Sequence, residues 1–322
     1  MRAIVVSVDA MGAVYVRAQL AAGKLPRLGA LAQAGAFTLN ARADYDFTVT
    51  LPNHTSMLTG RPVEADPDLP ADAYHGWTIN ALVDSTTTLH NSGNPNLSYV
   101  ASAFDVAHDH GRRTCLYAGK LKFMLFANSY GARYGAPDGV GEDNGRNKID
   151  RVVILEKATE QLIAAVESDL AGGACDFAFI HIPDLDVVGH ASGWGGEEWL
   201  ATLDLVDEWI GRIARFASPE ATGSPYALVV TADHGGNSYD HSDTTLPLDY
   251  TIPFFVVAPG LGPNTDLYAL AGPRRLNPGD GRPRNSGPSQ PIRNGDAGNT
   301  ALALMGLPPI PGSLFRGLLE TR

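Results

Sequence analysis

The chain has 322 residues, enough for one large α/β domain, and its 44% of hydrophobic residues exclude a globally disordered protein. Its formal net charge of -11 argues against binding to a nucleic-acid duplex, which needs a basic surface, but not against a small phosphorylated substrate held by a metal ion. No apolar stretch reaches the roughly 18 residues of a membrane span, and the first residues lack a signal-peptide pattern. We therefore expect no membrane contact and a cytoplasmic location, while the oligomeric state is left open.

Short apolar runs alternate along the chain with stretches whose apolar residues recur at helical spacing. In chain order, the expected elements are strand 3–9, helix 53–60, helix 97–111, strand 114–118, helix 151–173, strand 176–182, helix 197–217, strand 226–233 and strand 253–259. Strands that are apolar throughout are typical of parallel sheets covered on both faces. The alternation therefore predicts an α/β fold with a mostly parallel central sheet and helices on both faces.

Two segments rich in Gly, Asn and Pro interrupt this alternation, at residues 128–148 and 260–296. We expect a single domain over residues 1–322 that carries these two segments as loop insertions. The second insertion contains five arginines, at positions 274, 275, 282, 284 and 293. A solvated surface loop is the favoured interpretation, and a lid over an anionic substrate is the alternative.

The two cysteines, Cys115 and Cys175, each lie beside a strand-like run. Two buried thiols are the favoured interpretation, and a single disulfide is the alternative, because its geometry cannot be judged from sequence.

Acidic and histidine side chains stand at the ends of three of the predicted strands. Asp9 ends the first strand, and Asp233 and His234 stand at the end of 226–233, with His241 seven residues further on. Residues 176–182 are followed by Asp184, Asp186 and His190. In doubly wound sheets, ligands bind beyond the carboxyl ends of the strands. Each of these residues alone is more often structural than functional. Together they would repel one another or lie desolvated unless cations held them, and Asp with His is a ligand set that suits zinc.

A nucleophile is available in "TLPNHTSMLTG", where Thr50 stands before a helical pattern. For an isolated Thr or Asn at this position, helix capping is the more common role. A hydroxyl at a helix N-terminus also faces oriented N–H groups, which suit an alkoxide and a bound phosphate.

These motifs together resemble the alkaline phosphatase superfamily, specifically its nucleotide pyrophosphatase/phosphodiesterase branch, over nearly the whole chain. The motifs that carry the resemblance are "VSVDAMG", "TLPNHTSMLTG", "HGWTIN", "DVVGH", "DHGGNSYDH" and the helix pattern D-x-x-I-G-R formed by Asp207, Ile210, Gly211 and Arg212. The resemblance implies an alkaline-phosphatase-like core and two divalent metal ions, with zinc the favoured metal. It implies one ion held by Asp186, His190 and His241, and another held by Asp9, Asp233 and His234, with Thr50 completing the second set.

The resemblance also implies the chemistry of phosphoester hydrolysis. Thr50 would be the nucleophile that forms a covalent phosphothreonine, and Asn80, with the backbone N–H after Thr50, would bind phosphoryl oxygens. The favoured function is a two-metal phosphodiesterase or nucleotide pyrophosphatase acting on a small phosphorylated substrate.

Two lysines, Lys120 and Lys122 in "LYAGKLKFML", favour a second function. Two exposed lysines at a strand end are the favoured interpretation. In an extended segment, however, they would point the same way and could bind a dianionic phosphoryl group or a carboxylate. The alternative is therefore a phosphomonoesterase or phosphonoacetate-type hydrolase. A diesterase would instead use an apolar shelf, for which Trp77, Phe123 and Tyr130 are the candidates, although a place in the core is the favoured interpretation of these aromatic residues. A non-catalytic relative is disfavoured, because the nucleophile and all six ligands are present.

Overall fold

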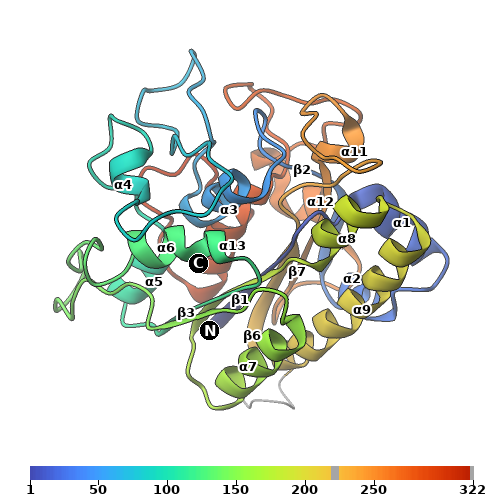
Figure 1. The fold of residues 1–322 in the computed structure, drawn as a ribbon, viewed down its shortest axis with the longest axis horizontal. Coiled ribbons are helices and arrows are strands. Elements are labelled where there is room, and N and C mark those ends of the chain that lie inside the picture. Colours follow the sequence, from blue (N-terminus) through green and yellow to red (C-terminus); the bar gives the residue numbers. More distant parts are fainter. Residues whose placement is uncertain (219–224, 320–322) are drawn as a thin grey trace.

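The computed structural model describes residues 1–218 and 225–319, and its strands form one eight-stranded sheet in the order β4-β3-β5-β1-β6-β7-β2-β8 (Figure 1). The strands are β1 (Arg2–Val8), β2 (Ala36–Arg42), β3 (Thr114–Ala118), β4 (Arg151–Ile154), β5 (Phe177–Ile182), β6 (Tyr226–Thr231), β7 (Thr251–Val257) and β8 (Thr265–Asp266). β1 pairs in parallel with β5 and β6, whereas β7 runs antiparallel to β6 and β2. The predicted α/β fold with a mostly parallel sheet is confirmed.

Helices cover both faces of the sheet (Figure 1). One face carries α1 (Ala13–Ala21), α2 (Pro26–Ala34), α7 (Thr159–Ala171) and α9 (Glu197–Ala214), with α8 (Asp184–Ser192) packed on α9. The other face carries α13 (Ala297–Met305), against which α3 (Thr50–Thr59) and α5 (Ala103–Asp109) pack. Shorter elements are α4 (Leu89–Ser92), α6 (Met124–Ser129), α11 (Pro247–Tyr250), α12 (Leu267–Ala271) and the 3₁₀ turns η1 (Leu121–Phe123), η2 (Arg215–Ala217), η3 (Gly272–Arg274) and η4 (Asn294–Asp296). Among the described residues, we find no helix with the length and apolar character that crossing a bilayer requires.

The central strands β5, β1 and β6 are buried over almost their whole length. A strand sandwiched between two helical layers must be apolar on both of its faces, which explains the continuous apolar runs of these segments. Their carboxyl ends lie next to one another because the three strands are adjacent and parallel. The polar residues that follow each strand are therefore brought to one edge of the sheet.

The structure differs from the sequence expectation in several elements. Residues 151–154, predicted as the start of a helix, form the edge strand β4, and α7 begins only at Thr159. Residues 97–102 are not helical, because α5 starts after Ser102, whose hydroxyl and Asp105 form a capping box. The antiparallel partner β2 and the helix α8 were not predicted.

Two residues of the D-x-x-I-G-R pattern, Asp207 and Arg212, connect α9 to the neighbouring helices α2 and α7. The Asp207 carboxylate on α9 accepts hydrogen bonds from the backbone N–H groups of Arg27 (2.9 Å) and Leu28 (2.8 Å) in the first turn of α2. It therefore satisfies donors that α2 cannot pair internally. Arg212 extends from the same helix to Glu160 and Glu167 of α7. This motif positions α2 and α7 and does not reach the carboxyl edge of the sheet.

Buried lysine and arginine side chains attach both predicted insertions to the rest of the fold. In residues 128–148, the fully buried Lys148 ammonium donates to Asp109 (2.8 Å) and to Asp138. In residues 260–296, Arg275 pairs with Asp296, and the buried Arg293 donates to backbone carbonyls. The division of the chain into one domain with two insertions stays a prediction.

The two cysteines form a disulfide, so the expectation of two free buried thiols was wrong. Cys115 on β3 and Cys175, just before the neighbouring strand β5, have Cα atoms 5.8 Å apart. Adjacent parallel strands bring the two side chains within bonding reach, which sequence spacing alone could not show. Disulfides are rare in the cytosol, so this bond does not favour the expected cytoplasmic location. That location stays a prediction.

Replacing both cysteines by serine should lower the free energy of unfolding by about 2–4 kcal/mol, because the bond closes a loop of 60 residues. Urea unfolding of the variant and of the oxidised parent would measure the difference. Thiol titration of the unfolded, unreduced parent provides the control, with no free thiol expected. Two free thiols would show that the bond does not form.

Candidate active site

Three adjacent strands place the predicted ligands at one edge of the sheet. Asp9 directly follows β1, and its backbone N–H still donates to Ile182 of β5 (2.9 Å), which continues the ladder. Asp233 and His234 follow β6. Beyond β5, the chain enters α8, where Asp186 and His190 are four residues apart and so lie on one helical face.

The structure assembles the predicted ligands into two clusters, each made of three residues whose ligand atoms lie within 4.8 Å of one another: Asp9, Asp233 and His234 in the first, and Asp186, His190 and His241 in the second. These are the two sets that the family resemblance implied. The first set is fully buried, whereas the second contains His190, whose side chain is 46% exposed, and opens to a cavity.

Distances within the clusters match those expected around a tetrahedral ion. His234 Nε2 lies 3.3 Å from Asp9 Oδ1 and 3.3 Å from Asp233 Oδ2. In the other cluster, Asp186 Oδ1 lies 3.4 Å from His190 Nε2 and 3.3 Å from His241 Nε2, and the two Nε2 atoms are 3.1 Å apart. Zinc bonds of about 2.0–2.2 Å in tetrahedral geometry separate neighbouring ligand atoms by roughly 3.3–3.5 Å. The donor sets therefore fit two divalent cations.

Backbone carbonyls fix how the three histidines present their rings. Each Nδ1 lies within hydrogen-bond distance of a carbonyl oxygen: His190 of Tyr239 (3.0 Å), His234 of Gly235 (2.8 Å) and His241 of Thr48 (2.6 Å). A carbonyl can only accept, so in the neutral ring Nδ1 carries the proton and Nε2 presents its lone pair. Partners of this kind are the usual support of metal-binding histidines.

Within the part of the chain that the structure describes, the ligand atoms of the buried cluster have no hydrogen-bond partner. They are Asp9 Oδ1, Asp233 Oδ2 and His234 Nε2, and Asp186 Oδ1 in the other cluster shares this property. The opposite oxygen of Asp233 is held by the backbone N–H groups of Ala10 (3.0 Å) and His234 (2.9 Å). Ala10 reaches this position with a φ of 64°, which is rare for a residue other than glycine. Buried polar atoms without partners are costly, and a cation would compensate them.

The carboxylates of the site cannot ionise together without positive charge. Burial raises the pKa of Asp233 well above its ordinary value, and the charge of Asp9 adds to this effect. Burial also opposes ionisation of Asp9, but the Lys120 ammonium and the contacts with His181 and His234 together outweigh it and hold the pKa of Asp9 well below its ordinary value. Cations at the two clusters would relieve this repulsion.

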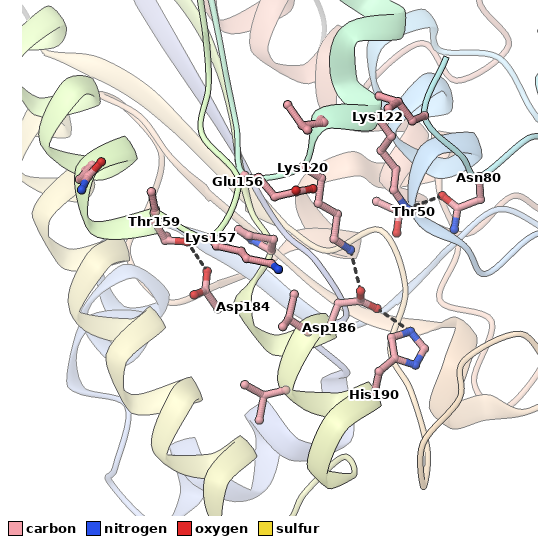
Figure 2. Close-up of a pocket in the computed structure, with 18 of the residues that line it drawn as sticks. Thr50, Asn80, Lys120, Lys122, Glu156, Lys157, Thr159, Asp184, Asp186 and His190 are labelled. Atoms are coloured by element: carbon pink, nitrogen blue, oxygen red, sulfur yellow. Dashed lines mark hydrogen bonds and ion pairs between the residues drawn. The ribbon is translucent and has the colours of Figure 1, made fainter. Parts of the chain in front are cut away.

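Lys120 lies between the two clusters. Its Nζ is 2.5 Å from Asp9 Oδ2 and 2.6 Å from Asp186 Oδ2, and the contact with Asp186 is drawn in Figure 2. Burial lowers its pKa, but the two carboxylates raise it more, so the net pKa lies above the ordinary value of lysine. Lys120 therefore serves as an internal counter-ion that joins the two clusters.

Thr50, Asn80 and Lys122 gather at one side of the cavity (Figure 2). Thr50 is the first residue of α3. Asn80 Oδ1 accepts from the Leu51 backbone N–H (3.0 Å) and from Lys122 Nζ (2.9 Å), which leaves the amide Nδ2 free to act as a donor. The sequence analysis expected the Leu51 N–H to bind a phosphoryl oxygen. In the structure this N–H donates to Asn80 instead.

Two other expectations about this region were wrong. The lysines do not lie in an extended segment, because Lys120 precedes the 3₁₀ turn η1 and Lys122 lies within it, and their ammonium groups have different partners. The aromatic residues proposed as an apolar shelf, Trp77, Phe123 and Tyr130, are fully buried and do not line the cavity. In the part of the chain that the structure describes, no arginine of residues 260–296 lines it either.

The sequence interpretation missed two buried histidines, His54 and His181, that lie next to the carboxylates of the first cluster. His181, the penultimate residue of β5, accepts from the Gly119 N–H at Nδ1 (3.3 Å), so its Nε2 donates to Asp9 Oδ2 (3.0 Å). His54 Nδ1 lies 2.7 Å from the carbonyl oxygen of Thr50. Burial lowers the pKa of both rings, which keeps them neutral. His54 was visible in the "TLPNH" motif, whereas His181 was hidden in an apolar strand.

A third group of His and Asp residues, His108, Asp109 and Asp138, also has metal-like spacing. Here the Lys148 ammonium already binds both carboxylates. One ammonium thus contacts every carboxylate of this group, whereas Lys120 is shared between the other two clusters and contacts only Asp9 and Asp186.

Comparison with known proteins decides the family. A model of the type I phosphodiesterase/nucleotide pyrophosphatase family matches residues 75–261, more than half of the chain. The chain belongs to this family. The resemblance inferred from the motifs is thereby confirmed.

Solved structures support the fold of this family member. It superimposes with a TM-score of 0.61 on the murine ectonucleotide pyrophosphatase/phosphodiesterase 5, an inactive variant in complex with AMP, at 12% identity over 95% of both chains. A protein of the alkaline phosphatase superfamily from Vibrio parahaemolyticus gives a TM-score of 0.60 at 15% identity, over 98% of this chain and 69% of that chain. The alkaline-phosphatase-like core is confirmed.

The curated relatives are longer proteins. The chain spans 11% and 26% of the lengths of the two that it matches. One is the 2,3-bisphosphoglycerate-independent phosphoglycerate mutase of Rhodopirellula baltica, which is 29% identical over 172 residues, or 52% of this chain.

The His241→Ala variant should bind about one zinc ion per chain where the parent binds about two, because it removes a ligand of the open cluster only. Elemental analysis after dialysis against zinc would measure the ratio. The matched control is His108→Ala in the group balanced by Lys148, which should keep the parental value. An unchanged ratio of two in His241→Ala would remove His241 from the ligand set.

Proposed function

We propose that the protein is a two-metal phosphoester hydrolase, of phosphodiesterase or nucleotide pyrophosphatase type, that works through a phosphothreonine at Thr50. The observation that carries the proposal is the pair of Asp/His clusters with oriented Nε2 lone pairs, placed beside a hydroxyl at a helix N-terminus. Membership of the type I phosphodiesterase family supports the reaction class, and the AMP bound by the murine neighbour supports a small phosphorylated substrate.

Two divalent cations, with zinc favoured, would lower the pKa of the attacking hydroxyl and offset the charge of the phosphoryl group when bound. The residues around them supply the rest of the chemistry. Thr50 Oγ gives up its proton and forms a bond to phosphorus, while the bond to the leaving oxygen breaks and that oxygen takes up a proton. A water molecule then gives up a proton and forms the new P–O bond, the bond to Thr50 breaks, and Thr50 Oγ takes up a proton, which restores the hydroxyl.

The N-terminus of α3 and the side chain of Asn80 orient the phosphoryl group. The positive end of the α3 dipole favours negative charge beside Thr50, while the Leu51 N–H is used to hold Asn80. Asn80 is held through its Oδ1 by Leu51 and Lys122, so its Nδ2 is available to donate to a phosphoryl oxygen. Such fixed donors stabilise charge as it develops in the transition state.

The alternative function, a phosphomonoesterase or phosphonoacetate-type hydrolase, depends on one observation. Lys122 lines the cavity beside Asn80, and it binds no carboxylate among the described residues. Lys120 lines the same cavity but already contacts Asp9 and Asp186. A second negative charge on the substrate would therefore be recognised mainly by Lys122.

Thr50→Ala should lower turnover of an aryl phosphodiester by at least ~10³-fold, because it removes the nucleophile, while zinc content stays at the parental value. Steady-state rates and elemental analysis measure the two effects. Thr50→Ser is the matched control, since it retains a hydroxyl and should retain measurable turnover and a trappable phospho-enzyme. If Thr50→Ala kept more than a few per cent of the parental rate, Thr50 would not be the nucleophile.

Lys122→Ala should reduce kcat/KM for an aryl phosphomonoester and for phosphonoacetate at least ~10-fold more than for an aryl phosphodiester, because only the first two carry a second negative charge. The comparison uses one enzyme preparation and three substrates. The exposed Lys157, which lines the same cavity, provides the control substitution Lys157→Ala. Equal losses on all three substrates would rule out the alternative function.

A further inference from the structure

The cavity beside Thr50 continues well past the two clusters. It has a volume of about 970 Å³ and runs to the first turn of α7 and to Trp209 of α9. Figure 2 shows Thr50, Asn80 and Lys122 at one end and Thr159 and Asp184 at the other, with Lys120 and Asp186 between them. The space beyond the reacting phosphorus is therefore large enough for a substantial substituent of the substrate.

Three separate elements expose aliphatic side chains into this cavity. Leu82 comes from the loop after Asn80, Leu121 from η1 and Val187 from α8. Their exposed fractions are 64%, 41% and 52%. A single exposed leucine is ordinary, but aliphatic groups that converge on one cavity beside a nucleophile indicate a binding surface for apolar groups.

Apart from the cluster histidines, the described residues that line the cavity offer no exposed aromatic face for stacking. Among the described residues that line it, Trp209 is the sole Trp, Tyr or Phe, and only 4% of it is exposed. Its Nε1 donates to Glu160 (2.9 Å), which fixes the ring. A nucleobase is recognised mainly by stacking on aromatic side chains, and this cavity lacks the surface for it.

The acidic groups in the half of the cavity farther from Thr50 are largely engaged. Asp184 accepts from the Thr159 hydroxyl (2.7 Å), and Glu160 binds Arg212 and Trp209. The exposed Glu156 and Lys157 carry opposite charges on adjacent residues. Most of these charges thus have an oppositely charged neighbour, and the exposed aliphatic side chains that line the cavity supply its apolar surface.

We propose that this cavity binds a saturated aliphatic substituent, so that the substrates are phosphoesters of aliphatic alcohols and not nucleotides. The inference rests on the proposed phosphoester hydrolase function and narrows its substrate class. The phosphoryl group occupies the end formed by Thr50, Asn80 and the clusters. The alkyl chain lies against Leu82, Leu121 and Val187 and removes their apolar surface from water.

The test uses p-nitrophenyl phosphodiesters in which the second substituent is methyl, butyl or hexyl, together with the p-nitrophenyl ester of thymidine 5′-monophosphate. Release of p-nitrophenol reports every substrate equally. We expect kcat/KM to rise with chain length by up to ~4-fold per methylene, which corresponds to about 0.8 kcal/mol, and the hexyl ester to exceed the thymidine ester. A flat series, or a thymidine ester that is preferred over the hexyl ester, would overturn the inference.

This design separates the two proposals. If no phosphodiester is turned over, including the methyl ester, the proposed diesterase function fails. If the methyl ester is turned over but chain length has no effect, only the aliphatic substrate class fails.

Variants of the aliphatic wall give a second readout. Leu82→Gln and Val187→Gln should each flatten the dependence of kcat/KM on chain length, because they place a polar group where the alkyl chain packs. Both residues are largely exposed, so the fold should tolerate the changes. The matched control is Leu205→Gln on α9, which is 48% exposed and lies outside the cavity, and which should leave the whole series unchanged. An unchanged slope in both wall variants would contradict the assignment.

Discussion

The mutual repulsion of three carboxylates at one edge of the sheet is the constraint on which the site depends. Asp9, Asp186 and Asp233 arrive there because β5, β1 and β6 are adjacent and parallel. Burial makes their charges costly, and the raised pKa of Asp233 is one consequence. The short contacts of Lys120 with Asp9 and Asp186 are another. Bound cations would relieve this repulsion, and the proposed chemistry depends on them.

The surrounding backbone orients the ligands before any cation binds. Carbonyl groups hold Nδ1 of all three histidines, and the N–H of Ala10 holds one oxygen of Asp233. His181 adds a hydrogen bond to Asp9 from within the sheet. These contacts come from segments far apart in the sequence, so the accuracy of the site depends on the packing of the whole core. Preorganisation of this kind is what metal affinity and catalysis both need.

The sequence was sufficient to predict the central strands and to name the residues that form the two Asp/His clusters. It was insufficient for features that depend on contacts between segments far apart in the chain. β1, β5 and β6 were predictable because both of their faces are buried, whereas the edge strand β4 is half exposed and resembled the start of a helix. The Cys115–Cys175 bond and the roles of His181 and Lys120 depend on which strands are neighbours. Motif spacing found the groups that could bind metal, but only the structure could show that the proposed aromatic shelf is part of the core.

The most direct test of the account is a zinc titration of the chelator-treated chain in which bound metal and hydrolysis of an aryl phosphodiester are followed together. The account predicts no turnover without metal, and a rate that reaches its maximum as occupancy approaches two ions per chain. Full turnover in the chelated protein, or a maximal rate with no bound metal at the two Asp/His clusters, would contradict it.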